Sequence, residues 1–198
     1  MRLKPSPDLS FTAVYRNFSG DMRTTYDARD VARVIEELTR SIAAAFPPDK
    51  PLNVIGIRTR GENLAQRLVD RLRSQGFAQI GFGTLDVTLY RDDLSSIGTS
   101  HAIRPTDIYI DLADKPLLLV DDVLHTGRSV RAALNALNDF GRPSVVRLAV
   151  LADRGGRELP IAADFVGIHL KEVPEDHRVN VRFVEADGRD EIVVEPRS

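Results

Sequence analysis

The chain has 198 residues, of which 42% are hydrophobic and 28% are charged, with a formal net charge of −2. That length suits one domain with a sizeable core, and the small net charge gives no global field that would attract nucleic acid. The sequence has no Cys, which excludes disulfides, zinc thiolate sites and Cys nucleophiles. No apolar run reaches the ~18 residues of a membrane span, so we expect a cytoplasmic protein without a membrane partner.

The N-terminal part divides into an irregular segment and a helix. Residues 1–24 show no clear period, and we expect a loosely ordered arm there, followed by a single domain over residues 25–198. Apolar residues recur at helical spacing from about 28 to 46. Asp27 is suited to cap the start of this helix, and Pro47 to end it.

The central part alternates strands and helices. Residues 52–57, LNVIGI, form an apolar run typical of a strand buried on both faces, and a helix is expected over 62–73. Residues 79–90 and 108–112 are predicted strands. The polar stretch 91–107 between them is a long loop, which in a compact domain is usually functional or mobile.

The segment PLLLVDDVLHTGRSVRAALNALNDFG at 116–141 is the most informative. Its LLLV is a predicted buried strand, residues 121–129 a loop, and the apolar residues after them one face of a helix. That face comprises Val130, Ala133, Leu134 and Leu137. Residues 145–151 form another apolar strand, and shorter strands are expected near 164–168, 181–184 and 191–194. This alternation predicts an α/β fold with a mostly parallel twisted sheet flanked by helices.

Ligands of open parallel sheets bind beyond the carboxyl ends of the strands, where two loops carry polar residues. In one loop, Thr126, Gly127, Arg128 and Ser129 lie at a helix N-terminus, whose free N–H groups attract an anion such as phosphate. Asp121 and Asp122 precede them. A carboxylate pair beside a phosphate site makes sense if it binds the 2′- and 3′-hydroxyls of a ribose whose 5′-phosphate occupies the helix terminus.

Other interpretations of this loop exist. An Asp pair at a strand end also holds Mg²⁺ in response-regulator receivers, although there it usually follows the first strand. The tetrapeptide TGRS alone is often only a capped helix. The P-loop pattern GxxxxGK[ST] and the dinucleotide pattern GxGxxG are both absent.

The string LLLVDDVLHTGRS resembles the binding motif for 5-phosphoribosyl 1-pyrophosphate (PRPP) of type I phosphoribosyltransferases. Four further segments resemble the PyrR family: GIRTRG (56–61), DVTLYRDDL (86–94), GRPSVVRLAVLADRG (141–155) and RELPIAADFVG (157–167). Members of that family are uracil phosphoribosyltransferases, and in many bacteria they also regulate pyrimidine biosynthesis by binding mRNA. The similarity extends over roughly 27–195, and it implies the type I phosphoribosyltransferase fold with a small hood.

The resemblance also implies roles for particular residues. The pyrophosphate of PRPP would meet the backbone amides of Thr59, Arg60 and Gly61, in a loop where a cis peptide is common. Residues 91–107 would form a flexible lid from which Arg91 reaches the pyrophosphate.

The resemblance further places the hood over the base at 152–168, where backbone groups would recognise the edge of uracil. Asp153 would help to bind Mg²⁺ through water. His125 departs from the family, which usually has an aromatic residue such as Tyr there. His125 either lines the phosphate loop or titrates when UMP binds.

Catalysis of this kind needs no nucleophilic side chain, because Mg²⁺ and the protein stabilise the departing pyrophosphate while N1 of uracil attacks. Three interpretations of the function remain: a uracil phosphoribosyltransferase, an mRNA-binding regulator with little catalysis, and a phosphoribosyltransferase for another base. We also expect a homodimer or a larger homo-oligomer.

Charge argues against tight binding of an mRNA leader. The first helix with its cap has four acidic and three basic residues, and the stretch 153–178 has six acidic and four basic ones. Affinity for phosphates requires several converging cations, so we expect RNA binding to be weak or absent.

Overall fold

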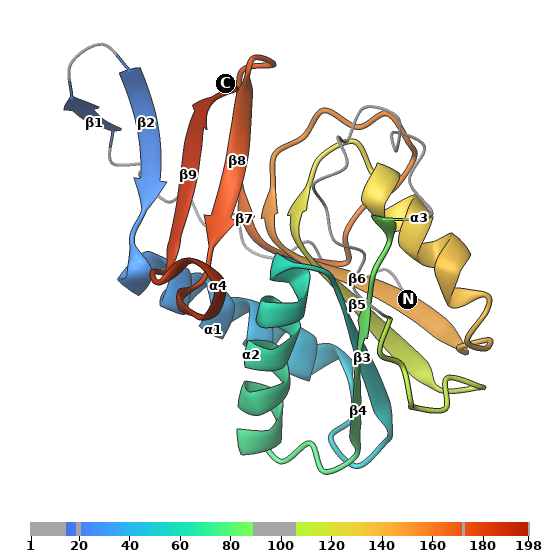
Figure 1. The fold of residues 1–198 in the computed structure, drawn as a ribbon. Coiled ribbons are helices and arrows are strands. Elements are labelled where there is room, and N and C mark those ends of the chain that lie inside the picture. Colours follow the sequence, from blue (N-terminus) through green and yellow to red (C-terminus); the bar gives the residue numbers. More distant parts are fainter. Residues whose placement is uncertain (1–14, 19–20, 89–105, 172, 198) are drawn as a thin grey trace.

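The computed structural model describes residues 15–18, 21–88, 106–171 and 173–197. It contains a five-stranded parallel sheet in the order β4-β3-β5-β6-β7 and a four-stranded antiparallel sheet in the order β1-β2-β9-β8 (Figure 1). The parallel sheet comprises β3 (Leu52–Ile57), β4 (Ile80–Leu85), β5 (Pro116–Leu124), β6 (Val145–Asp153) and β7 (Phe165–His169). The antiparallel sheet comprises β1 (Tyr15–Phe18), β2 (Asp21–Tyr26), β8 (His177–Arg182) and β9 (Glu191–Pro196).

Four helices connect or flank these strands. They are α1 (Ala28–Ala45), α2 (Arg60–Ser74), α3 (Arg128–Leu137) and the short α4 (Val184–Asp187). The expected cap of α1 is confirmed, because Asp27 Oδ1 accepts hydrogen bonds from the backbone N–H groups of Arg29 (2.8 Å) and Asp30 (3.1 Å). These bonds satisfy two of the N–H groups that have no partner inside the helix.

Both faces of the parallel sheet are covered, as its apolar strands predict. Alternate residues point to opposite faces, so Val54 and Leu118 pack in the cluster formed with α1 and α2, whereas Ile55 and Leu119 pack in the cluster that includes α3. All four side chains are fully buried. The parallel sheet therefore provides a rigid base for the loops at its carboxyl edge.

The antiparallel sheet lies beside α1 and α2 rather than inside this layered core (Figure 1). One of its faces is apolar, and Val181, Phe183 and Ile192 join the same cluster as α1 and α2. The alternate residues of β8 (Arg178, Asn180 and Arg182) are charged or polar, as are Glu191 and Glu195 on either side of Val193 in β9. The sheet thus has one buried face and one face that is free to contribute to a polar site.

The structure corrects several expectations. Residues 108–112 form no strand, and only the preceding residue, Asp107, forms a bridge, with Thr84 of β4. Ile108 and Ile110 pack against the second core cluster, which explains the alternating apolar pattern without a hydrogen-bonded ladder. Leu134 was expected on the buried face of α3 but is 38% exposed.

Two larger assignments also change. The segment 152–168, expected to form the hood, is instead the end of β6, a loop and the start of β7. The second layer is the antiparallel sheet of residues 15–18, 21–26, 177–182 and 191–196. Its first two strands lie where no regular element was expected, and the rest of the expected arm, 1–14 and 19–20, falls outside the described residues. No helix in the described part of the chain is long and apolar enough to cross a membrane.

Candidate active site

Two loops meet at the carboxyl edge of the parallel sheet. The turn between β3 and α2 packs against the end of β5, and a Cβ on Gly61 would lie 2.7 Å from the carbonyl oxygen of Val120 and 3.0 Å from Cα of Asp121. Only a glycine permits this approach. The peptide between Arg58 and Thr59 is cis, as the resemblance implies for this loop. The structure therefore brings Thr59, Arg60 and Gly61 next to the carboxylate pair.

The second loop ends at the N-terminus of α3. The capping residue is Gly127, with a left-handed backbone (φ 91°) and no side chain to cap the helix. Thr126 Oγ1 accepts a hydrogen bond of 3.3 Å from the backbone N–H of Arg128, and Ser129 lies in the first turn. The helix start has the geometry of an anion site. The Arg128 side chain turns away from it and pairs with Glu158.

Arg157 holds this loop in place, a role that sequence reasoning missed. Its guanidinium donates to the carbonyl oxygens of His125 (2.8 Å) and Ile161 (3.0 Å) and pairs with Asp153 at 2.5 Å. Asp153 also accepts from the backbone N–H of Gly155. Both carboxylate oxygens of Asp153 are thus engaged within the protein. The available signal was the i, i+4 spacing of an acid and a base directly after the apolar strand at 145–151.

His125 lines the loop, and its surroundings favour the neutral ring. Its removal from water lowers its pKa first, and the neighbouring Arg154 lowers it further. A Cβ on Gly156 would lie 2.9 Å from His125 Nε2, so the ring packs directly on the backbone of the 155–156 turn. The geometry favours the interpretation that His125 lines the phosphate loop.

The carboxylate pair is partly withdrawn from water. Asp121 is 7% exposed, and its Oδ1 accepts a hydrogen bond of 3.0 Å from the backbone N–H of Asp122. Burial raises the pKa of the Asp122 carboxyl, whereas its contact with Asp121 and the positive charge of Arg60 act in the opposite direction. Burial therefore disfavours the charged form of Asp122, and hydrogen bonds from a ligand would favour that form again.

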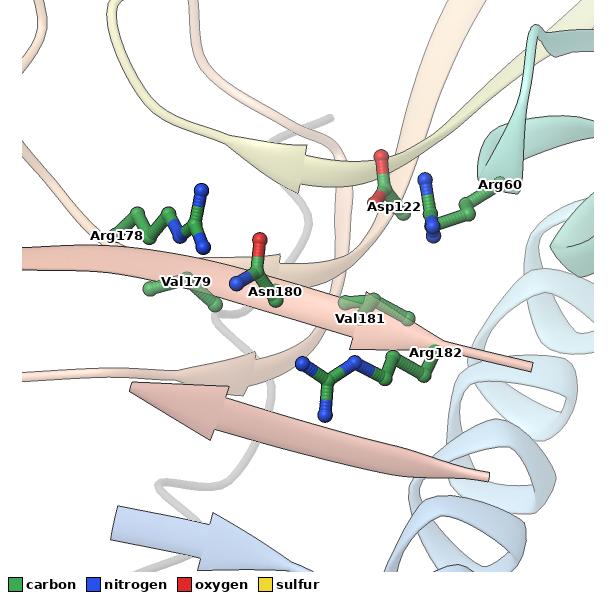
Figure 2. A pocket seen from close by; sticks show the side chains of 7 residues that line it. All are labelled: Arg60, Asp122, Arg178, Val179, Asn180, Val181 and Arg182. Atoms are coloured by element: carbon green, nitrogen blue, oxygen red, sulfur yellow. The ribbon is translucent and has the colours of Figure 1, made fainter. Parts of the chain in front are cut away.

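A cavity of about 240 Å³ joins these loops to the antiparallel sheet. Its lining residues are Arg60, Asp122 and the five residues 178–182 of β8 (Figure 2). Arg60 is held by Asp187 in α4, because Nη2 of Arg60 donates a hydrogen bond of 2.8 Å to Oδ1 of Asp187. The contribution of β8 was missed because alternation of charged and apolar residues at 178–182 is typical of any half-exposed strand.

Arg91 and most of the expected lid, 91–105, lie outside the described residues. The described ranges contain no group of three or more His, Cys, Asp or Glu side chains placed to hold a metal ion. A hard ion such as Mg²⁺ that is bound mainly by phosphate oxygens and water needs no such cluster. The open helix terminus and the carboxylates fit a ligand that brings its own metal.

Comparison with known proteins agrees with this geometry. The model of the phosphoribosyl transferase domain matches residues 23–185. Proteins called "Bifunctional protein PyrR" from Syntrophobacter fumaroxidans and Desulfosudis oleivorans are 44% and 47% identical to this chain. The alignments cover 87% and 85% of the chain and 92% and 93% of the relatives.

The chain belongs to the PyrR family of phosphoribosyl transferases. The hypoxanthine phosphoribosyltransferase of Trypanosoma cruzi has the same fold, with a TM-score of 0.62 at 19% identity over 87% of this chain and 95% of that one. A hypoxanthine phosphoribosyltransferase from Staphylococcus aureus gives 0.60 at 19% identity over 85% and 89%. The expected type I phosphoribosyltransferase fold is therefore confirmed, and so is the expected family.

Proposed function

We propose that this protein transfers the ribose 5-phosphate of PRPP to uracil, which forms UMP and pyrophosphate. The observation that supports the proposal is the meeting of three groups at one edge of the sheet. They are the open N-terminus of α3 at Gly127, the carboxylates Asp121 and Asp122, and the turn at Thr59–Gly61. Their order matches a 5′-phosphate, a ribose and a pyrophosphate in turn.

Each group has a separate task. The N–H groups of residues 127–129, with the hydroxyls of Thr126 and Ser129, hold the 5′-phosphate. Asp121 and Asp122 accept hydrogen bonds from the ribose hydroxyls, and the backbone amides of residues 59–61 hold the pyrophosphate. N1 of uracil forms a bond to C1 of the ribose as the bond from C1 to the pyrophosphate oxygen breaks, and the N1 proton leaves to solvent. The protein contributes position and charge stabilisation rather than a nucleophile.

Mg²⁺ is the cofactor of this proposal, and it would enter the site with PRPP, since a hard ion of this kind can be held mainly by phosphate oxygens and water. When bound, it neutralises charge on the departing pyrophosphate. Asp153 is the candidate for a contact through water, and each of its oxygens already accepts one hydrogen bond within the protein. Arg91 is the candidate cation of the lid.

The choice of uracil comes from the PyrR resemblance, and a direct assay tests it. Protein, PRPP and Mg²⁺ are mixed with each nucleobase in turn, and the nucleotide formed is measured. We expect UMP from uracil, and none without Mg²⁺. Turnover with guanine or adenine but none with uracil would show that the enzyme serves another base.

The relatives carry the word "bifunctional" in their name, so a second activity needs its own test. UMP-dependent binding of an mRNA leader is the second activity that the family resemblance implies, and we propose that it is weak or absent in this protein. We also propose that the protein acts in the cytoplasm as a homodimer or a larger assembly. A monomer mass by light scattering at micromolar concentration would contradict the oligomer.

A further inference from the structure

One side chain that lines the cavity is held in a single orientation and has no role in the proposed reaction. Asn180 lies in the middle of β8, between Val179 and Val181, which face the apolar cluster. Because strand residues alternate, Asn180 lies on the opposite, polar face, and it lines the cavity together with Asp122 and Arg60.

The neighbouring carboxylate decides which end of the Asn180 amide enters the cavity. The Nδ2 group of Asn180 donates to Glu195 Oε1 on β9, at 2.5 Å. An ionised carboxylate only accepts hydrogen bonds, so the NH₂ group must face Glu195 and the Oδ1 atom must face away. In Figure 2 the amide oxygen points from β8 toward the side where Asp122 and Arg60 lie.

Glu195 is itself held in place by two arginines. Its Oε1 also pairs with Arg178 at 3.2 Å and with Arg182 at 3.8 Å, and its side chain is only 13% exposed. Every partner of this oxygen donates to it, so it acts as an acceptor toward Asn180 as well. The amide of Asn180 therefore cannot turn over without placing its oxygen against a carboxylate.

We propose that Asn180 is a specificity-determining residue, whose Oδ1 accepts a hydrogen bond from the imide N3–H of the base. This inference rests on the proposed transfer to uracil. Uracil has N–H at N3 between two carbonyl groups, whereas cytosine has a bare N3 acceptor beside an amino group. A fixed acceptor thus pairs with uracil and opposes N3 of cytosine. Arg178, which lines the same cavity and only donates, suits a carbonyl oxygen of uracil.

The size of the effect follows from one hydrogen bond. Leaving a buried polar partner unpaired costs roughly 1–3 kcal/mol, which corresponds to about a 5- to 150-fold change in affinity. Asn180 is half-buried, so we expect the lower part of that range.

Binding of UMP and CMP tests this directly, because the two nucleotides share their ribose and phosphate. Titration calorimetry gives both dissociation constants for the full-length protein, and steady-state kinetics gives KM for uracil and for PRPP. For Asn180→Ala we expect UMP binding to weaken about tenfold and KM for uracil to rise about tenfold. CMP binding and KM for PRPP should stay within twofold of the unmodified protein.

A second variant tests the orientation without changing the cavity wall. In Glu195→Gln the residue opposite Asn180 can donate as well as accept, so the amide can present either end. We expect CMP to bind more tightly and UMP to change little. Glu191→Gln is the matched control, because Glu191 pairs with Arg182 on the same face but does not line the cavity. It should leave the ratio of the two dissociation constants unchanged.

Three outcomes would overturn the proposal. They are an unchanged UMP to CMP ratio in Asn180→Ala, an equal loss of both nucleotides, and an unchanged CMP affinity in a folded Glu195→Gln. Failure of the proposed function is distinct, because then the unmodified protein itself forms no UMP from uracil and PRPP.

Discussion

The two sheets of the molecule are stabilised by different interactions. The parallel sheet has apolar residues on both faces, and its strands are buried between α1 and α2 on one side and α3 on the other. The antiparallel sheet has one polar face with ion pairs between neighbouring strands, such as Arg178 with Glu195. It is also joined to α2 by Arg67, which pairs with Glu185 and Asp190 at 2.7 Å and lies over the ring of Phe183.

This difference separates two parts of the proposed site. The proposed ribose ligands lie at the end of β5 and the proposed phosphate site in the turn that follows it, where packing of the parallel sheet defines their positions. The opposite wall of the cavity is β8, whose polar side chains are held by ion pairs. Substitutions that disturb packing in the parallel sheet should therefore lower the stability of the whole domain. Substitutions that remove charges from the antiparallel sheet should first alter the cavity.

The largest expected effect is in the core of the parallel sheet. Leu118→Ala removes a fully buried side chain, and the cavity it leaves should lower the free energy of unfolding by about 2–5 kcal/mol. Urea denaturation measures this loss. Val184→Ala, at a 56% exposed position, should stay within about 0.5 kcal/mol. A loss below 1 kcal/mol for Leu118→Ala would mean that packing contributes less here than proposed.

The next effect is on activity. Asp122→Asn should lower kcat/KM about ten- to a hundredfold, because a charge-assisted hydrogen bond to the ribose contributes roughly 1.5–3 kcal/mol. Its stability at pH 7 should not fall, because burial raises the pKa of this carboxyl and the neutral amide removes the cost of the buried charge. We expect a similar loss of activity for Asp121→Asn. A variant that loses stability while keeping its activity would refute the ribose assignment.

The pairs between α2 and the antiparallel sheet should give a smaller loss. Arg67→Met keeps most of the stem but leaves Glu185 and Asp190 without their partner, which should cost about 1–2 kcal/mol. Arg73→Met on the exposed side of the same helix is the control and should cost less than about 0.5 kcal/mol. Equal losses for the two variants would show that Arg67 does not fasten the sheet.

The same pairs predict a dependence on pH. Hydrogen bonds from Arg67 lower the pKa of Asp190 and of Glu185, and hydrogen bonds from Arg60 lower that of Asp187. A lowered folded-state pKa stabilises the protein above the unfolded value near pH 4, and this stabilisation is lost as the pH falls through the folded value. The melting temperature should therefore fall below about pH 4, by less in Arg67→Met. An identical fall in both proteins would argue against these pairs as the source.

The smallest effect concerns RNA, for which we expect weak or no binding at physiological salt. On α1, Arg33 pairs with Asp30 and Arg40 with Glu36, and the Arg157 guanidinium is engaged by carbonyl groups and Asp153. These three cations are thus already engaged within the protein and less available to phosphates. Filter binding of a pyrimidine-operon leader at two salt concentrations, with and without UMP, provides the measurement. Tight binding that UMP enhances would show that the protein is bifunctional like its named relatives.

The parallel sheet could be predicted from sequence because local pattern and final environment agree there. The apolar run of β3 implies a strand that is buried along its whole length, and the helical spacing of α1 implies one buried face. The structure has both. The antiparallel sheet could not, because its strands come from both ends of the chain and pair across some 170 residues, as Thr24 and Val194 do. No local signal encodes such a pairing.

The proposed site also has one part that could be predicted from sequence and one part that could not. The motif at 121–129 predicted the phosphate and ribose side of the proposed site because its residues are consecutive. Asn180 and Asp187 meet Asp122 and Arg60 only in space, so the opposite wall stayed hidden. Alternating polar residues on β8 indicated a half-exposed strand but not what the exposed half would face.

The pairing of β2 with β9 also has a consequence for synthesis of the chain. On the ribosome the strands of the parallel sheet emerge in order, and β3 to β7 can associate before β8 and β9 have left the exit tunnel. β2 must wait for β9, its partner near the other end of the chain. The cavity at Asp122 therefore gains its second wall last, so a nascent chain can have a folded core well before it has a complete binding site.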